Sequence, residues 1–115
     1  MTFSVRTGVD GFGRCVVHPV GQLDLGTVDA FEEALAAVET SRPPTIVVDL
    51  RELSFLDSTG LRCLIGADSR ARSEARRLVL IPGSEPVQRV FRLTLVDERL
   101  DFEDDRAPDA EGGDA

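Results

Sequence analysis

A chain of 115 residues is long enough for one domain with a single hydrophobic core. It holds no Trp and no Tyr, and an aromatic share of 5% argues against a nucleic-acid surface built on base stacking. The net charge of −8 argues against nucleic-acid binding as well, because that binding favours cationic protein surfaces.

Most of this negative charge lies near the C-terminus. Residues 101–115 hold seven acids and one Arg, whereas the first hundred residues hold fourteen acids and twelve Arg. A segment rich in like charge and poor in apolar residues is typical of a solvated, disordered tail. We therefore predict a folded domain over residues 1–103 and an acidic disordered tail over residues 104–115.

The N-terminal residues predict a β-hairpin. Apolar and polar residues alternate over residues 3–9, G-F-G at 11–13 indicates a turn, and R-C-V-V-H-P-V at 14–20 indicates a second strand. The glycines of this region lack the strand-then-helix context of a phosphate-binding loop, so they are interpreted as turn residues.

A helix and a strand are predicted next. Over residues 28–38 the apolar positions recur every three or four residues, which predicts an amphipathic helix with Thr27 as its N-cap. Arg42-Pro43-Pro44 ends this helix, because proline cannot continue it. The β-branched run at 46–48 predicts a short central strand that is buried on both faces.

The C-terminal half predicts two further strand–helix units. A second amphipathic helix is expected to reach about Ser73, with the Arg-rich group of residues 70–77 as its solvated end. A short strand follows at 78–81, Ser84 and Pro86 open a third helix, and an edge strand is expected within 95–102. This order of elements predicts an α/β fold, with right-handed crossovers between parallel strands.

The stretch F-L-D-S-T-G-L at 55–61 places two adjacent hydroxyls where the chain passes into a helix. Capping of the helix explains one of them, and acceptance of a phosphoryl group is the alternative. The apolar flanks, Phe55-Leu56 and Gly60-Leu61, are expected to fix Ser58 and Thr59 in a tight turn. Gly60 leaves the backbone open to the approach of another molecule.

Enzymatic chemistry finds little support. A nucleophilic serine needs a base, and His18, the only histidine, is interpreted as structural; the chain has no Lys and no G-x-S-x-G elbow. A carboxylate pair of Asp49 and Asp57, as in an aspartyl-phosphate pocket, lacks the Lys that such a pocket uses. Cys15 and Cys63 have no metal-ligand spacing and are expected to be buried hydrophobes. We predict no catalytic residue, no metal site and no cofactor.

Four segments together resemble the STAS domain, and more narrowly the bacterial anti-sigma factor antagonists. They are V-G-Q-L-D at 20–24, the strand that ends in Asp49-Leu50, L-S-F-L-D-S-T-G-L at 53–61, and P-V-Q-R-V-F-R-L at 86–93. The resemblance covers about residues 3–103. It implies a mixed sheet of four to five strands, with an N-terminal hairpin and three to four helices packed on the sheet.

The resemblance also implies a function in partner switching. The unmodified antagonist binds an anti-sigma factor, a serine kinase of the histidine-kinase-like ATPase type, and thereby frees the sigma factor. The kinase then phosphorylates the serine after the motif aspartate, here Ser58 with Thr59 as second choice, and a PP2C-type phosphatase reverses the reaction. The implied partner-binding residues are Asp24, Asp57, Ser58, Thr59, Gly60 and Leu61. The protein itself is then a ligand and a substrate and not an enzyme, and we expect a monomer when it is alone.

Two alternatives stay open: the small STAS subunit of a lipid-asymmetry ABC transporter, and a nucleotide-binding or enzymatic role. No signal peptide or spanning apolar run is seen, so the expected location is the cytoplasm, with no membrane contact. The chain departs from the family pattern in three places. Gln22 replaces a frequent Glu, and the segments 74–77 and 94–97 replace turns that usually contain Gly.

Overall fold

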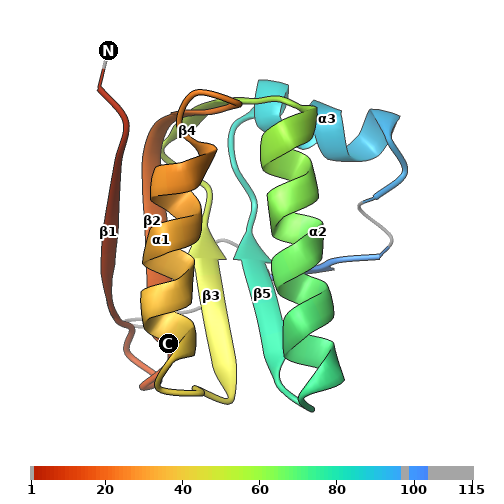
Figure 1. The fold of residues 1–115 in the computed structure, drawn as a ribbon. Coiled ribbons are helices and arrows are strands. Elements are labelled where there is room, and N and C mark those ends of the chain that lie inside the picture. Colours follow the sequence, from red (N-terminus) through yellow and green to blue (C-terminus); the bar gives the residue numbers. More distant parts are fainter. Residues whose placement is uncertain (1, 97–98, 104–115) are drawn as a thin grey trace.

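The structure is a computed structural model, and it describes residues 2–96 and 99–103 (Figure 1). The predicted tail, residues 104–115, lies outside the described residues. The elements in chain order are β1 (Ser4–Val9), β2 (Cys15–Leu23), α1 (Val28–Glu39), β3 (Thr45–Asp49), β4 (Leu53–Leu56), α2 (Ser58–Ser73), β5 (Arg77–Ile81), α3 (Glu85–Leu93) and β6 (Asp101–Phe102). The predicted α/β class is confirmed, and so are the N-terminal hairpin and the helices.

The strands form one mixed sheet with the order β1-β2-β3-β5-β6. Within the described residues, β1 and β2 pair antiparallel, and the pairs β2–β3, β3–β5 and β5–β6 are parallel. The described part of the sheet has six strands, where four to five were expected, because β4 pairs with the end of β2 outside the main order. Residues 53–56, to which the sequence analysis assigned no helix or strand, therefore form a strand.

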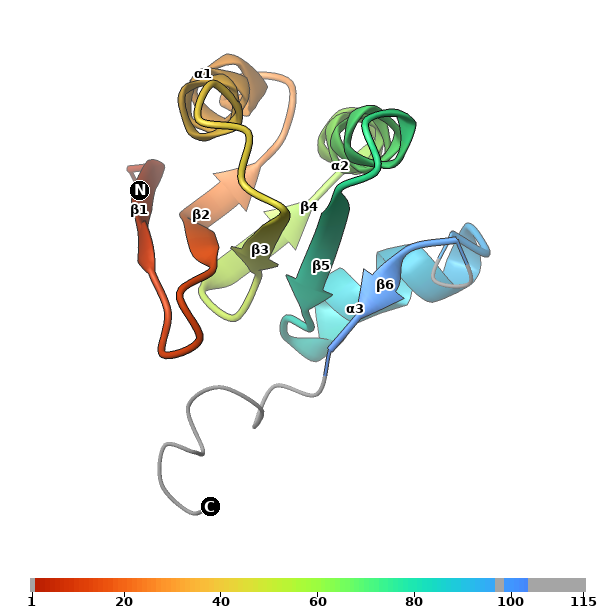
Figure 2. The ribbon, with the colours of Figure 1, turned by 90° about the horizontal axis from the view of Figure 1, so that it is seen from below.

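Two helices cover one face of the sheet. Figure 2 shows α1 and α2 side by side on that face. Their apolar stripes meet the strand side chains that point the same way, which include Val17, Ile46, Val48, Leu78 and Leu80. The run Ile46–Val48 is buried throughout, as predicted for the central strand. No helix in the described part of the chain is long and apolar enough to span a membrane.

The third helix lies at the end of the sheet where β3 and β5 terminate (Figure 1). It buries Val87 and Phe91, and the Phe91 ring meets Phe102 of β6 edge to face, with 5.1 Å between the ring centroids. Of the strand expected within 95–102, the last two residues are confirmed as β6, and residues 97–98 lie outside the described residues. At residue 95 the expectation is wrong, since Leu95 instead follows the end of α3 with a φ of 60°.

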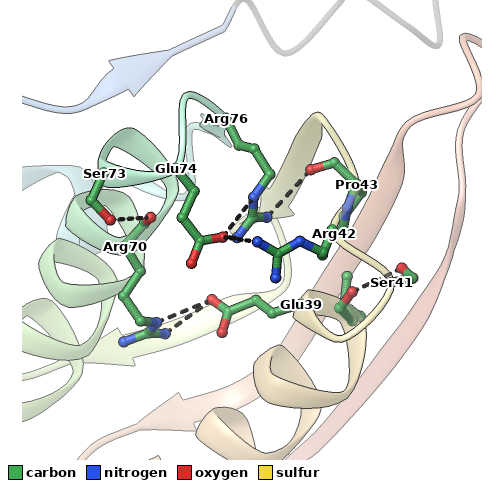
Figure 3. A network of polar contacts seen from close by, with 9 residues as sticks. Glu39, Ser41, Arg42, Pro43, Arg70, Ser73, Glu74 and Arg76 are labelled. Carbon is green, nitrogen blue, oxygen red and sulfur yellow. Dashed lines mark hydrogen bonds and ion pairs between the residues drawn. The ribbon is translucent and has the colours of Figure 1, made fainter.

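Ion pairs join the C-terminal ends of α1 and α2 (Figure 3). The Arg70 guanidinium lies 3.0 Å from the Glu39 carboxylate, and Glu74 lies between Arg42 and Arg76, at 3.8 and 2.6 Å. The Arg-rich end of α2 is thus paired with acids of the same domain. These contacts stabilise the pole of the molecule opposite to the first turns of the two helices.

Candidate switch site at the first turns of two helices

The motif residues lie at the carboxyl edge of the sheet, where β2 and β4 end next to each other. Leu23 and Leu56 are partners in the parallel register of these strands, and the Asp57 amide donates to the Leu23 carbonyl at 3.3 Å. Each strand is followed by an aspartate and then by a helix. The fold therefore brings Asp24 and Asp57, far apart in sequence, to one edge.

Asp57 is the N-cap of α2. Its Oδ1 accepts a hydrogen bond from the Gly60 amide at 3.0 Å, and its carbonyl accepts from the Leu61 amide at 2.9 Å. An aspartate in this position satisfies amide groups that the first helical turn leaves without partners. Capping is thus performed by the carboxylate, and neither hydroxyl of the motif is needed for it.

Ser58 is the first residue of α2 and is exposed. Within residues 2–96 and 99–103 its hydroxyl has no hydrogen-bond partner, whereas Thr59 is half-buried and lines a groove between the helices. Ser58 is therefore the more accessible of the two hydroxyls, and its modification would break no hydrogen bond of that hydroxyl within the described residues.

Gly60 and Leu61 lie beneath the surface of the site. Both residues are buried, and Leu61 belongs to the core. A Cβ built on Gly60 would lie 2.7 Å from Leu56 Cδ1, 2.8 Å from Leu23 Cγ and 2.9 Å from the Leu23 carbonyl oxygen. Glycine is therefore required for the first turn of α2 to pack closely onto the ends of β2 and β4. Among the predicted partner-binding residues, these two shape the surface from within, since little of either reaches it.

Asp24 lies in a hydrogen-bonded turn before α1. Its Oδ1 accepts from the Gly26 amide at 3.0 Å, and its own amide donates to Thr27 Oγ1 at 3.0 Å. The Thr27 hydroxyl donates to the Gln22 carbonyl at 2.7 Å. Thr27 is at the predicted N-cap position, but its side chain ties the turn to the end of β2 and does not cap the helix.

A groove of about 320 Å³ runs between the first turns of α1 and α2. It is lined by Val28, Glu32, Thr59, Arg62 and Cys63. Burial, and then the neighbouring carboxylate of Glu32, raise the pKa of the Cys63 thiol to about 12. This thiol is therefore protonated and unreactive at neutral pH. Cys63 is buried as expected, whereas Cys15 is only half-buried.

His18 and Asp49 lie elsewhere. Both line a second cavity of about 320 Å³ on the sheet face opposite to α1 and α2. The Asp49 carboxylate accepts hydrogen bonds from Arg51 Nε and Nη2 at 3.0 and 2.8 Å, and His18 Nδ1 is 3.5 Å from it. The considered pairing of Asp49 with Asp57 is not formed, because their side chains have different partners on different parts of the sheet.

Sequence reasoning missed two features of this edge. Leu25, at the tip of the turn after β2, is 75% exposed, and Phe55 on β4 is 46% exposed. An apolar residue between Asp24 and Gly26 was the available signal for the first. For Phe55 the signal was the pattern L-S-F-L, in which apolar residues stand at three of four positions.

Comparison with known proteins defines the class to which this fold belongs. The family model described as the STAS domain matches residues 4–107. The chain therefore belongs to the STAS domain family.

Its curated relatives include proteins named anti-sigma-B factor antagonist. The one from Listeria monocytogenes is 32% identical over 78 residues, which are 68% of this chain and 68% of that protein. The one from Staphylococcus aureus is 31% identical over 74 residues, which are 64% of this chain and 68% of that protein.

Solved structures agree with this assignment. The anti-sigma factor antagonist from Mycobacterium paratuberculosis superposes with a TM-score of 0.78 at 27% identity, covering 88% of this chain and 85% of that one. The unphosphorylated form of the anti-sigma factor antagonist SpoIIAA gives a TM-score of 0.69 at 23% identity, covering 97% and 99% of the two chains. At that identity the likeness to SpoIIAA concerns the fold alone.

Proposed function

We propose that this protein is an anti-sigma factor antagonist whose binding to its partner is switched off by phosphorylation of Ser58. The names of its relatives support the antagonist function. The observation that carries the switch is the exposed Ser58 hydroxyl, unpartnered within the described residues, on the first turn of α2 beside the turn that holds Asp24.

The proposed partner is an anti-sigma factor that is also a serine kinase of the histidine-kinase-like ATPase type. The unmodified protein binds it and so releases the sigma factor. A PP2C-type phosphatase restores the unmodified form. In this cycle the protein acts as a ligand and as a substrate, and catalysis belongs to its partners.

The switch works through charge. A phosphoryl group on Ser58 adds a charge of roughly −1.5 to −2 at neutral pH, next to the carboxylate of Asp57. A partner that packs against a neutral hydroxyl would then have to desolvate a dianion. Unpaired burial or like-charge contact costs several kcal/mol at an interface, and each ~1.4 kcal/mol lowers the affinity tenfold.

The same phosphoryl group is compatible with the fold. Ser58 is exposed, so modification displaces no packed side chain. The amide groups and the dipole of the α2 N-terminus favour a negative charge at this position. Asp57 already occupies the Gly60 amide, and its repulsion offsets part of this effect. We therefore expect the phosphorylated domain to keep its structure while it loses its partner.

A pull-down with the unmodified protein, followed by identification of the bound chains, tests the partner. Recovery of an anti-sigma factor of the kinase type supports the proposal, whereas recovery of an ABC-transporter ATPase in its place overturns it. With the recovered kinase and labelled ATP, Ser58→Ala is expected to abolish labelling, to remain folded and to bind the partner.

Thr59→Val is the matched control and is expected to be labelled like the wild type. Labelling of Ser58→Ala at the wild-type rate would refute the assignment of the acceptor. Ser58→Glu is expected to weaken binding of the partner, and binding at wild-type strength by enzymatically phosphorylated protein would refute the charge mechanism.

A further inference from the structure

We infer that Leu25 is an apolar anchor for the anti-sigma factor, separate from the Ser58 switch. This inference rests on the proposed function and adds to it the residue that supplies affinity. We expect the anti-sigma factor to have an apolar cleft that receives the Leu25 side chain.

Leu25 is exposed although its surroundings are ordered. Its side chain is 75% exposed, and it stands at the tip of the turn between β2 and α1. The residues on both sides are tied down: Asp24 Oδ1 accepts from the Gly26 amide at 3.0 Å, and the Thr27 and Val28 amides donate to the Asp24 carbonyl at 3.1 and 2.9 Å. A side chain held on a preformed turn loses little backbone entropy when it binds, which is a property of interface anchors.

The position of Leu25 relative to Ser58 follows from the strand register. Leu23 and Leu56 are partners in the β2–β4 pair, so the chain reaches Leu25 two residues after one partner and Ser58 two residues after the other. Both residues therefore lie at the same edge of the sheet. Phe55, 46% exposed and in register with Gln22, is the second apolar group at this edge.

Leu25 is close in the chain to the groove between α1 and α2. Val28, only three residues further along the chain, is part of its lining, and so is Thr59 next to Ser58. The groove thus lies between the helix that follows the leucine turn and the helix that begins with the phosphoacceptor. A partner that covers both places excludes water from Ser58, and this desolvation makes a phosphoryl group at that position costly.

Leu25→Ser tests the anchor, with Val9→Ser as matched control. Val9 is 69% exposed, and its register partner Cys15 is at the start of β2, so it lies at the pole opposite to Leu25. Binding of each variant to the anti-sigma factor recovered by the wild type is measured by titration calorimetry. We expect a Kd raised about tenfold or more for Leu25→Ser and changed less than about twofold for Val9→Ser.

A kinetic measurement separates anchoring from a structural effect. With Leu25→Ser as the substrate of the kinase, KM is expected to rise about as much as the Kd while kcat stays unchanged, because the reacting hydroxyl is intact. Wild-type Kd and KM for Leu25→Ser, in the presence of a working Ser58 switch, would overturn the anchor and leave the proposed function standing. If the wild type binds no anti-sigma factor, the proposed function falls first.

Discussion

Replacement of Gly60 by alanine is the sharpest test of how α2 is seated at the site. The added methyl group would lie within 3.0 Å of three atoms: Leu56 Cδ1, Leu23 Cγ and the Leu23 carbonyl oxygen. Leu23 is 0% exposed and Leu56 is 3% exposed, so neither side chain can move outward to make room for the methyl group. The carbonyl oxygen accepts the hydrogen bond of the Asp57 amide and belongs to the β2 backbone.

Two opposing effects set the magnitude. Alanine is favoured over glycine within a helix by up to about 1 kcal/mol. Overpacking of a filled core costs about 1–3 kcal/mol, and here one of the crowded atoms belongs to the backbone. The clash therefore outweighs the helical preference, and we expect Gly60→Ala to lower the free energy of unfolding by about 1–2 kcal/mol.

Gly66→Ala, in the same helix, is the matched control. A Cβ on Gly66 has Arg70 Nη1 as its nearest neighbour, at the ordinary contact distance of 3.7 Å. Helical preference then acts alone, and the free energy of unfolding should rise by about 0.5–1 kcal/mol. Urea denaturation followed by circular dichroism measures both variants. Equal stabilisation by the two substitutions would refute the close packing of Gly60 against Leu23.

Three further predictions follow from the structure. Ala75 and Leu95 have φ angles of 59° and 60°, so Ala75→Gly and Leu95→Gly should each raise the free energy of unfolding by about 1 kcal/mol in urea denaturation, and a loss of stability would contradict the left-handed turns. Burial would raise the pKa of Asp49, but the hydrogen bonds and charge of its neighbours hold this pKa below its usual range. Ionised Asp49 therefore stabilises the folded protein at pH values above its unfolded pKa of about 3.9, and this contribution is lost as the pH falls through its lower pKa in the folded protein. Asp49→Asn should therefore show a flatter fall of Tm below about pH 4, and an acid limb as steep as that of the wild type would contradict this. Burial and a nearby carboxylate raise the pKa of the Cys63 thiol to about 12, so iodoacetamide at about pH 8 should alkylate half-buried Cys15 first in the native protein. Equal alkylation of the two cysteines, measured by mass spectrometry, would refute the burial of Cys63.

The sequence was sufficient for the order of the main elements because their periodicities are clear. The apolar positions of α1 and α2 repeat at helical spacing, and Ile46–Val48 has the composition of a buried strand. β4 was not predicted because four residues are too few to show a periodicity. Its strand conformation depends on pairing with β2, which the local sequence does not encode. Residues 95–96 were misassigned to a strand because both are apolar, whereas Leu95 adopts a backbone conformation that usually requires glycine.

The two departures from glycine-containing turns have the same structural explanation. Ala75 and Leu95 each follow a helix C-cap, and each turn closes with a pair of backbone hydrogen bonds: Arg76 to Ala71 and Ala75 to Arg72, and likewise Val96 to Phe91 and Leu95 to Arg92. This is the Schellman pattern, in which the left-handed residue is commonly glycine. This chain thus forms both turns without the glycine that most easily adopts the left-handed conformation.

The candidate site was predictable in its motif and less so in its surroundings. Asp57, Ser58 and Thr59 stand out as two hydroxyls after a carboxylate at a helix start. That the carboxylate performs the capping and leaves Ser58 exposed required the geometry. Thr27 joins the Leu25 turn to β2 through a hydrogen bond from its hydroxyl to the Gln22 carbonyl, and no sequence pattern predicts this bond.

A switch that leaves the domain unchanged needs a surface that is rigid before and after modification. The ends of β2 and β4 are paired, Asp57 caps α2, and the turn after β2 is closed by its own hydrogen bonds. At the opposite pole, ion pairs between Glu39 and Arg70 and around Glu74 hold the other ends of the two helices. Since phosphorylation of exposed Ser58 breaks none of these contacts, the proposed signal resides in the free energy of docking. The apolar groups at the same edge then set how large that signal is, because a phosphoryl group is costly only where the partner excludes water.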